Sequence, residues 1–215
     1  RQDSSGWQVE VVEATGSAEA KGARAAFYVG LRRPAEATEV LEKLSAEPRH
    51  WALARAKIAA IQYAEGKTSD AFRTASEVVA KQPTLASGHV VRGQLQLADG
   101  RVDEALRDGQ AAVKLDPASV EAHYLLGAAF EANRDLDAAA KSFAEALRLN
   151  PRAAPAQVRL AMIQLQKNDL SAATQLAEQV ALQQPGNLTA QLVVARSLLA
   201  RGDLDRASAV TRSLL

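Results

Sequence analysis

The sequence predicts an all-α solenoid, a stack of about six helical hairpins, on three observations. Pro83, Pro117, Pro151 and Pro185 recur every 34 residues. Small residues recur at two further positions of the same period, and a glycine or asparagine usually falls between them. Aromatic residues make up only 4% of the chain, so we expect a core of close helix contacts rather than a bulky sheet interior.

The proline period divides most of the chain into equal frames. With each proline at position 32, the frames are 52–85, 86–119, 120–153, 154–187 and a shorter 188–215. Position 20 is always alanine and position 8 is always small, the residues being Ala71, Ala105, Ala139, Ala173 and Ala207, and Ala59, Gly93, Gly127, Ala161 and Ala195. An earlier frame, 18–51, keeps Ala25 and Ala37, but its Pro48 falls one residue early, so we expect an irregular end there. The small residues predict two helices that approach closely once per repeat.

Each frame also marks a turn between its two helices. Position 15 mostly holds residues that tolerate a positive φ, namely Gly66, Gly100, Asn168 and Gly202. Arg134 stands there in the remaining frame, and we expect its neighbour Asn133 to take that role. Position 18 holds side chains that can cap the free N–H groups of a new helix, namely Ser69, Asp103, Asp137, Ser171 and Asp205. Each frame is therefore predicted to fold as helix, short turn, helix.

Charge and composition argue against several classes of function. Lys and Arg total 26 against 25 for Asp and Glu, a net charge of +1, so the chain offers nucleic acid or an anionic membrane no excess of basic residues. Without cysteine, the chain has no disulfide and no Cys-based metal site. No apolar run reaches the roughly 18 residues that a membrane-spanning helix needs. We therefore expect neither a nucleic-acid-binding nor a membrane-spanning protein.

Residues 120–151, VEAHYLLGAAFEANRDLDAAAKSFAEALRLNP, carry a family resemblance. The residues that match the family pattern are Leu126, Gly127, Phe130, Ala139, Phe143, Ala146 and Pro151. On these residues the chain resembles tetratricopeptide repeat (TPR) proteins, and the repeat extends over residues 18–215. In frame 86–119, Gly109 replaces the usual aromatic residue, and no frame has the family's tryptophan at position 4, where His89 and His123 stand. The resemblance implies a right-handed superhelix with a concave groove that binds other proteins.

The two ends depart from the repeat. Residues 1–17 leave three interpretations open, which are a remnant second helix of an earlier repeat with Trp7 packed on the array, a flexible tail, and a strand-like segment. The last frame stops at Leu214 and Leu215, an apolar end where such arrays usually carry a polar cap. We expect a fragment of a longer protein, with self-association through that end as the alternative.

No constellation of residues indicates catalysis. The three histidines are His50, His89 and His123, of which the last two occupy equivalent positions of successive frames. Aligned histidines can bind a metal, but without cysteine or an HExxH spacing we interpret these two as packing residues with a ring nitrogen bonded to a neighbour. Phosphate-binding loops and the GxSxG and GxGxxG motifs are missing from the sequence. The sequence therefore predicts no enzyme, no metal site and no cofactor.

The resemblance also implies which residues face the groove. In TPR arrays positions 2, 5, 6, 9, 12 and 13 of the first helices line it, and the candidate partner-binding residues here are Lys57, Tyr63, Gln94, Leu97, Tyr124, Leu125, Glu131, Arg159, Met162, Leu165 and Arg196. Within this set an apolar stripe with charged edges is typical of a protein-binding surface, and its members are Tyr63, Leu97, Tyr124, Met162 and Leu165. Position 9 lacks the asparagine of the family's carboxylate clamp, so an extended apolar peptide or an amphipathic helix is the expected ligand.

Two functions remain open from the sequence. The first is a non-catalytic module that binds another protein's peptide or helix in its groove, within a multiprotein assembly. The second is a structural scaffold that self-associates through hairpin edges and the apolar C-terminal end. The composition, rich in Ala, Leu, Arg and Gln, resembles that of bacterial TPR proteins and leaves both periplasm and cytoplasm open, with a lean toward the periplasm or the envelope.

Overall fold

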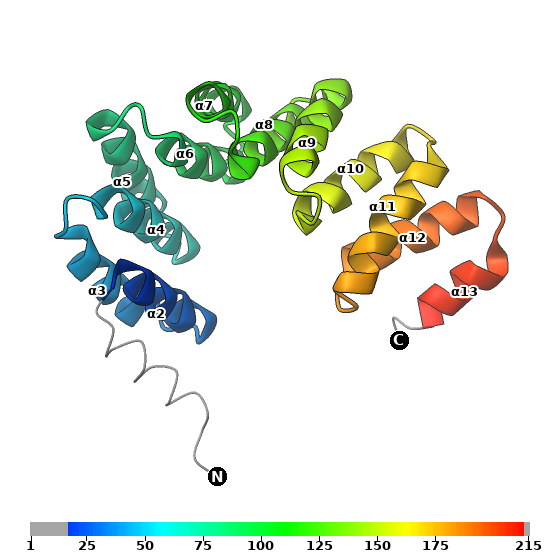
Figure 1. The fold of residues 1–215 in the computed structure, drawn as a ribbon, viewed down its shortest axis with the longest axis horizontal. Coiled ribbons are helices and arrows are strands. Elements are labelled where there is room, and N and C mark those ends of the chain that lie inside the picture. Colours follow the sequence, from blue (N-terminus) through cyan, green and yellow to red (C-terminus); the bar gives the residue numbers. More distant parts are fainter. Residues whose placement is uncertain (1–16, 213–215) are drawn as a thin grey trace, which may run out of the picture. The chain divides into compact units, whose positions relative to one another are not determined.

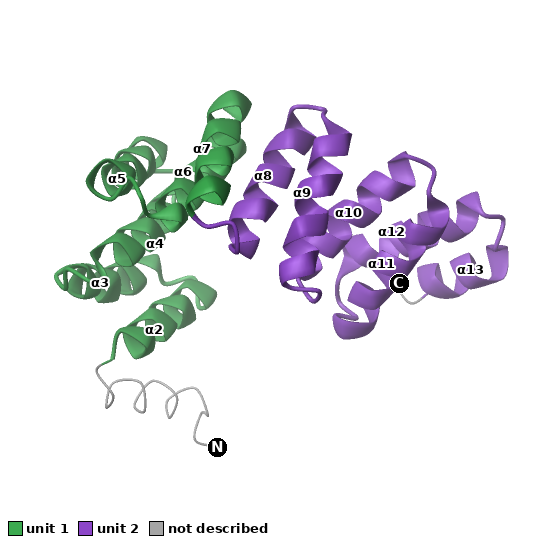
Figure 2. Cartoon of the chain, turned by 45° about the horizontal axis from the view of Figure 1, so that its top comes forward, with its two compact units in different colours: residues 1–115 green, residues 116–215 purple. Residues whose placement is uncertain are grey.

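A computed structural model describes residues 17–212, and within that range it has twelve α-helices joined by short turns and no strand (Figure 1). The chain divides into two compact units, Arg1–Leu115 and Asp116–Leu215 (Figure 2). The helices of the first unit are α2 (Ala18–Gly30), α3 (Pro34–Ser45), α4 (Trp51–Ala64), α5 (Thr68–Lys81), α6 (Ala86–Ala98) and α7 (Val102–Leu115). Those of the second are α8 (Val120–Ala132), α9 (Leu136–Leu149), α10 (Ala154–Gln166), α11 (Leu170–Gln183), α12 (Leu188–Ala200) and α13 (Leu204–Arg212). The predicted all-α solenoid class is confirmed.

Small residues lie where the two helices of each hairpin pack together. The position-20 alanines are at most 1% exposed, and the position-8 residues are buried in all six hairpins. In the hairpin of α8 and α9 the approach leaves no room for a larger residue, because a Cβ atom added to Gly127 would lie 2.8 Å from two ring carbons of Phe143. Phe143 is itself fully buried. The predicted close contact between paired helices is therefore confirmed.

One residue with a positive φ closes the first helix of every hairpin. These residues stand at position 15, with φ between 57° and 79°, and they are Arg32, Gly66, Gly100, Arg134, Asn168 and Gly202. The expectation that Asn133 would replace Arg134 is wrong, because Asn133 has a φ of −79°. The N–H groups of Arg134 and Asp135 donate to the carbonyl oxygens of Glu131 and Phe130, each at 3.0 Å. This Schellman pattern requires the left-handed residue at position 15 itself, whatever its side chain.

The caps of the second helices lie at position 16, two residues before the predicted ones. The carboxylates of Asp135 and Asp169 accept hydrogen bonds from the N–H groups of Ala138 and Ala172, at 3.0 and 3.1 Å. The predicted caps are instead the second residues of their helices. The aspartates among them place negative charge at the positive end of the helix dipole. The prediction failed because only one residue separates the left-handed residue from the next helix.

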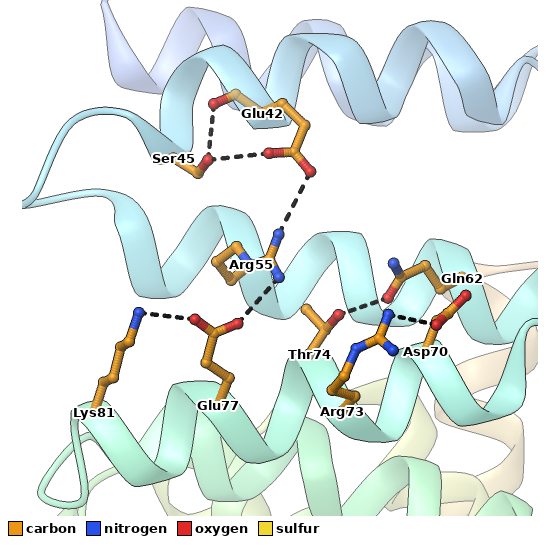
Figure 3. A network of polar contacts seen from close by, with 9 residues as sticks. All are labelled: Glu42, Ser45, Arg55, Gln62, Asp70, Arg73, Thr74, Glu77 and Lys81. Atoms are coloured by element: carbon orange, nitrogen blue, oxygen red, sulfur yellow. Dashed lines mark hydrogen bonds and ion pairs between the residues drawn. The ribbon is translucent and has the colours of Figure 1, made fainter.

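Position 4 holds polar side chains that connect a first helix to the elements beside it. Arg55 of α4 bridges Glu42 of α3, at 3.4 Å, and Glu77 of α5, at 3.1 Å (Figure 3). Glu77 also accepts a hydrogen bond from Lys81 at 2.8 Å. The bridge therefore joins two successive hairpins in the first unit.

The histidines at position 4 make a different contact. Nε2 of His89 lies 3.1 Å from the carbonyl oxygen of Pro83, and Nε2 of His123 lies 3.0 Å from that of Pro117. Each histidine thus ties its helix to the turn before it. Their interpretation as packing residues with a bonded ring nitrogen is confirmed.

The first hairpin ends irregularly, as the early Pro48 predicts. Helix α3 has 12 residues where α5, α7, α9 and α11 have 14. At the start of the described range, the side chain of Ser17 accepts a hydrogen bond from the N–H of Ala20 at 3.1 Å and caps α2. The expectations for residues 1–16 and for Leu214 and Leu215 lie outside the described residues.

We expect Gly127→Ala to destabilise the protein by about 1–2 kcal/mol, because its methyl group would displace a buried ring in a close-packed contact. Hydrogen exchange should show the loss of protection concentrated in α8 and α9, since a solenoid has only nearest-neighbour contacts. The control is Gly30→Ala, where nothing lies within 4 Å of an added Cβ. Equal loss of protection in all hairpins would contradict this prediction.

Gly100→Ala should cost about 1 kcal/mol in the free energy of unfolding, because alanine is strained at the φ of 76° found there. Gly186→Ala is the matched control, as both glycines have open space around an added Cβ and only Gly100 has a positive φ. Urea unfolding of both variants measures the difference. Equal effects of the two substitutions would show that turn strain is not the cause.

Candidate functional site

A pocket of about 410 Å³ opens on the first-helix face of the second unit. Its lining comes from α8, α10, α12 and the turn before α12, and consists of Tyr124, Ala154, Pro155, Val158, Arg159, Met162, Gln184, Asn187 and Thr189. Three of the predicted partner-binding residues, Tyr124, Arg159 and Met162, therefore lie together. This is the strongest correspondence between the predicted groove and the structure.

Helical periodicity explains how α10 builds most of this pocket. Pro155, Val158, Arg159 and Met162 follow one another at spacings that place them on one face of the helix. Val158 is buried and forms the apolar base, whereas Met162 is 36% exposed. In the turn before α12, Asn187 is held in place because its side chain caps that helix, accepting from the N–H of Ala190 at 3.1 Å. The pocket thus has an apolar floor and a polar rim.

Arg159 is the charged group of the pocket. Its Nη1 lies 3.4 Å from Oε1 of Glu131 on α8. Partial desolvation lowers the pKa of the Arg159 guanidinium, but the charge of Glu131 and a hydrogen bond with Tyr124 outweigh it, so that the pKa is raised. The guanidinium is therefore charged at every physiological pH. It has five N–H donors, so that donors remain for a ligand beside its contacts with Glu131 and Tyr124.

The other residues predicted for the groove in this unit lie in different environments. Leu125 is 0% exposed, so its prediction as a contact residue is wrong. An apolar side chain at position 6 turns into the space between helices, whereas the charged Arg159 at the same position stays exposed. Leu165 is half-buried against the core formed by α10, α11, α12 and α13, and Arg196 is exposed on α12.

A larger pocket, of about 690 Å³, lies in the first unit between α2, α3 and α4. Its lining consists of Ala25, Ala26, Val29, Arg32, Pro34, Leu41, Lys57, Ala60, Ile61, Ala64 and Glu65. Lys57 is the one predicted groove residue among them. Tyr63 is half-buried against a core cluster of α4, α5 and α6, Leu97 is half-buried on α6, and Gln94 is exposed.

The sequence prediction missed the walls of both pockets. Pro155 and Thr189 stand at position 2, which is a groove position in the family, but their side chains gave no reason to select them. Ala26, Ala60 and Ala64 were missed because small residues look like packing residues in a sequence. Their contribution is the space that they leave, which only the structure shows.

A buried ion-pair cluster lies in the hairpin of α6 and α7. Asp108 is 3% exposed and accepts two hydrogen bonds from Arg92, both at 2.7 Å, while Nδ1 of His89 lies 2.8 Å from it. Burial raises the pKa of the Asp108 carboxyl, but the hydrogen bonds from Arg92 and His89 outweigh it, and the pKa is lowered overall. Every carboxylate oxygen has a partner within the protein, which indicates a structural role.

Side chains that could bind a metal ion do not cluster within the described range. No group of three or more His, Asp or Glu side chains that could hold a metal ion occurs within residues 17–212. None of the helices described there combines the length and the apolar character that a bilayer crossing requires.

Comparisons with known proteins identify the family. Residues 90–158, 129–187 and 158–214 match the tetratricopeptide repeat model. These stretches cover more than half of the chain, which belongs to the tetratricopeptide repeat family. A comparison with curated proteins finds no match.

Several solved structures share the fold. A thermophilic TPR protein of Thermus thermophilus is 21% identical, with a TM-score of 0.70 over 85% of this chain and 100% of that one. PilF of Pseudomonas aeruginosa is 20% identical, with a TM-score of 0.76 over 96% of this chain and 91% of that one. The structure of the Cut9–Hcn1 hetero-tetramer of the APC/C contains a chain that is 16% identical, with a TM-score of 0.78 over 96% of this chain and 41% of that one. The family and fold point to a protein–protein interaction module and are typically non-catalytic.

The acid stability of the first unit should depend on Asp108. A carboxyl whose pKa is lower in the folded state than in the unfolded state stabilises the fold above its unfolded pKa of about 3.9, and this contribution is lost as the pH falls through the folded pKa. Asp108→Asn should cost about 2 kcal/mol at pH 7, because Arg92 loses its partner. Below pH 3 the difference between wild type and variant should shrink.

Urea unfolding of both proteins from pH 2.5 to 7 measures this difference. Asp103→Asn is the control, since Asp103 is exposed on the same helix. A difference between wild type and Asp108→Asn that stays constant over the whole pH range would contradict the assignment.

Proposed function

We propose that this chain is a non-catalytic protein–protein interaction module that binds a peptide or helix of a partner on the face formed by its first helices. The observation that carries the proposal is the pocket around Arg159, where an apolar floor and a charged donor lie side by side. Exposed apolar surface beside polar groups is typical of recognition sites. Tyr124 and Met162 supply one rigid and one adaptable contact to such a site.

A place within a multiprotein assembly is part of this proposal. The similar structures include chains solved in complexes, such as Cut9–Hcn1 and Naa15/Naa10 bound to HypK-THB. The predicted bacterial origin and the lean toward the envelope rest on composition alone. The expected ligand remains an extended apolar peptide or an amphipathic helix, because both fit an open face with apolar walls.

Partner capture with a pocket variant tests the proposal. The variant is Met162→Glu with Thr189→Glu, since both residues line the pocket and are exposed, so that the fold should tolerate the changes. Partners retained by the wild type should fall about tenfold or more in quantitative mass spectrometry, because buried apolar contact would be replaced by charge. The control is Ser171→Glu with Gln175→Glu, two exposed residues of α11. Equal recovery with all three proteins would refute binding at this pocket.

The alternative function is a scaffold that self-associates through the C-terminal hairpin. A specific observation favours it, namely that α12 and α13 expose large apolar side chains, which are Leu188, Leu192, Leu199 and Leu204. Each of them is at least 52% exposed. Light scattering across a hundredfold range of concentration distinguishes the two functions, because a scaffold grows in mass and a monomeric module does not. Leu192→Glu with Leu199→Glu should abolish any such growth.

A further inference from the structure

The pocket in the first unit lies where successive first helices separate. Helix α4 packs directly against α6, whereas α2 and α4 barely touch. Between them short side chains, Ala26, Ala60 and Ala64, leave a hollow whose floor is formed by the buried Ala25, Leu41 and Ile61. At about 690 Å³ the pocket is large enough for a bulky side chain with its neighbours.

The pocket is open along one side. Ala26, Val29, Ala60 and Ala64 are all exposed, and Val29 is 50% exposed although it is a large apolar residue. An alkyl chain laid in such an open hollow would leave much of its length in water. A peptide would bring its own polar backbone to the open side, so the shape favours a peptide over a lipid.

The charges around the pocket favour an anionic group. Of the three charged lining residues, Glu65 is paired with Lys67 at 3.2 Å, whereas the side chains of Arg32 and Lys57 make no hydrogen bond or ion pair with any residue that the structure describes. Lys57 is half-buried, and its Nζ reaches α2, where it would lie 3.6 Å from a Cβ atom added to Gly22. The pocket therefore has an excess of positive charge.

Lys57 is an exception among the half-buried lysines and arginines of this unit. Within the described part of the unit the other half-buried cations are each partnered: Lys21 with Glu47, Arg24 with Tyr28, Arg55 with Glu42 and Glu77, and Arg92 with Asp108. A partly desolvated ammonium without a partner loses hydration that nothing in the protein replaces. A carboxylate placed against Lys57 would restore this interaction, with apolar contact directly beside it.

We infer that this pocket anchors a partner peptide that presents an Asp or Glu side chain next to a bulky aliphatic or aromatic side chain. The apolar side chain fills the hollow between α2 and α4, and the carboxylate accepts hydrogen bonds from Lys57, with Arg32 at the rim. The inference rests on the proposed function in that the ligand is a protein segment. It adds a second site and its chemistry, in a unit that does not contain the Arg159 pocket.

A displayed library of random 12-residue peptides, fused at the C-terminus so that only side-chain carboxylates are present, tests the inference on the full chain. Peptides are selected that bind the wild type and fail to bind Ala60→Trp, in which an indole fills the pocket. The control for that substitution is Ala98→Trp, at an exposed position of α6 outside the pocket. Circular dichroism establishes that each variant keeps its helices.

We expect the selected peptides to carry an acidic residue beside Leu, Ile, Met, Phe or Trp. Their affinity should fall about tenfold or more in Lys57→Glu, the change expected for losing a charge-assisted hydrogen bond, and stay unchanged in Lys114→Glu, an exposed lysine outside the pocket. Fluorescence polarisation with the amidated synthetic peptides measures both.

Three outcomes would overturn the inference. The first is a selection in which no peptide distinguishes the wild type from Ala60→Trp. The second is a set of selected peptides that is not enriched in acidic residues. The third is that dodecanoate binds the wild type, Ala60→Trp abolishes this binding, and no peptide binds in the pocket. Each is separate from the proposed function, because partner capture dependent on Met162 and Thr189 would survive any of them. Loss of that capture with intact peptide binding at Lys57 would instead refute only the Arg159 site.

Discussion

The close approach of two helices at a pair of small residues is the constraint on which the rest of the structure depends. Ala139 of α9 and Gly127 of α8 show it most clearly, since the ring of Phe143 occupies the space that any larger side chain at Gly127 would need. Because the same two positions are small in every frame, each hairpin closes in the same way, and the left-handed residue at position 15 falls at the same place in each turn. Each repeat is therefore built around the same contact between its two helices, and a short turn joins those helices.

Polar contacts then join the hairpins to one another and to their turns, and they differ from repeat to repeat. Where the family has tryptophan, this chain uses Arg55 as a bridge between α3 and α5, and it places His89 and His123 against the preceding turns. In one hairpin a buried carboxylate, Asp108, is held by an arginine and a histidine. These contacts are individual to each repeat, so the effects of substituting them should be local, as in any chain with nearest-neighbour packing.

Both pockets arise from the same geometry, because the face of the first helices is not fully used in packing. Where α4 meets α6 directly, Tyr63 and Val91 pack against one core cluster, whereas the separation of α2 from α4 leaves a hollow lined by alanines. In each unit a cation stands at the edge of an apolar hollow, Lys57 in the first and Arg159 in the second. Arg159 already forms an ion pair with Glu131, whereas the Lys57 side chain forms none with the described residues. The two pockets therefore have different preferences for a ligand.

The sequence alone determined the fold class, the pairing of helices and the place of each turn, because these depend on a period of 34 residues and on small side chains that act locally. The sequence analysis located the caps two residues too late and assigned a positive φ to Asn133. Both errors arose because the preferences of single residues do not reveal which hydrogen bonds close a helix. Exposure on the groove face was decided only by tertiary structure. Leu125 and Arg159 share one repeat position, yet one is core and the other lines a pocket, because burial depends on the side chains of neighbouring helices and on the distance between those helices.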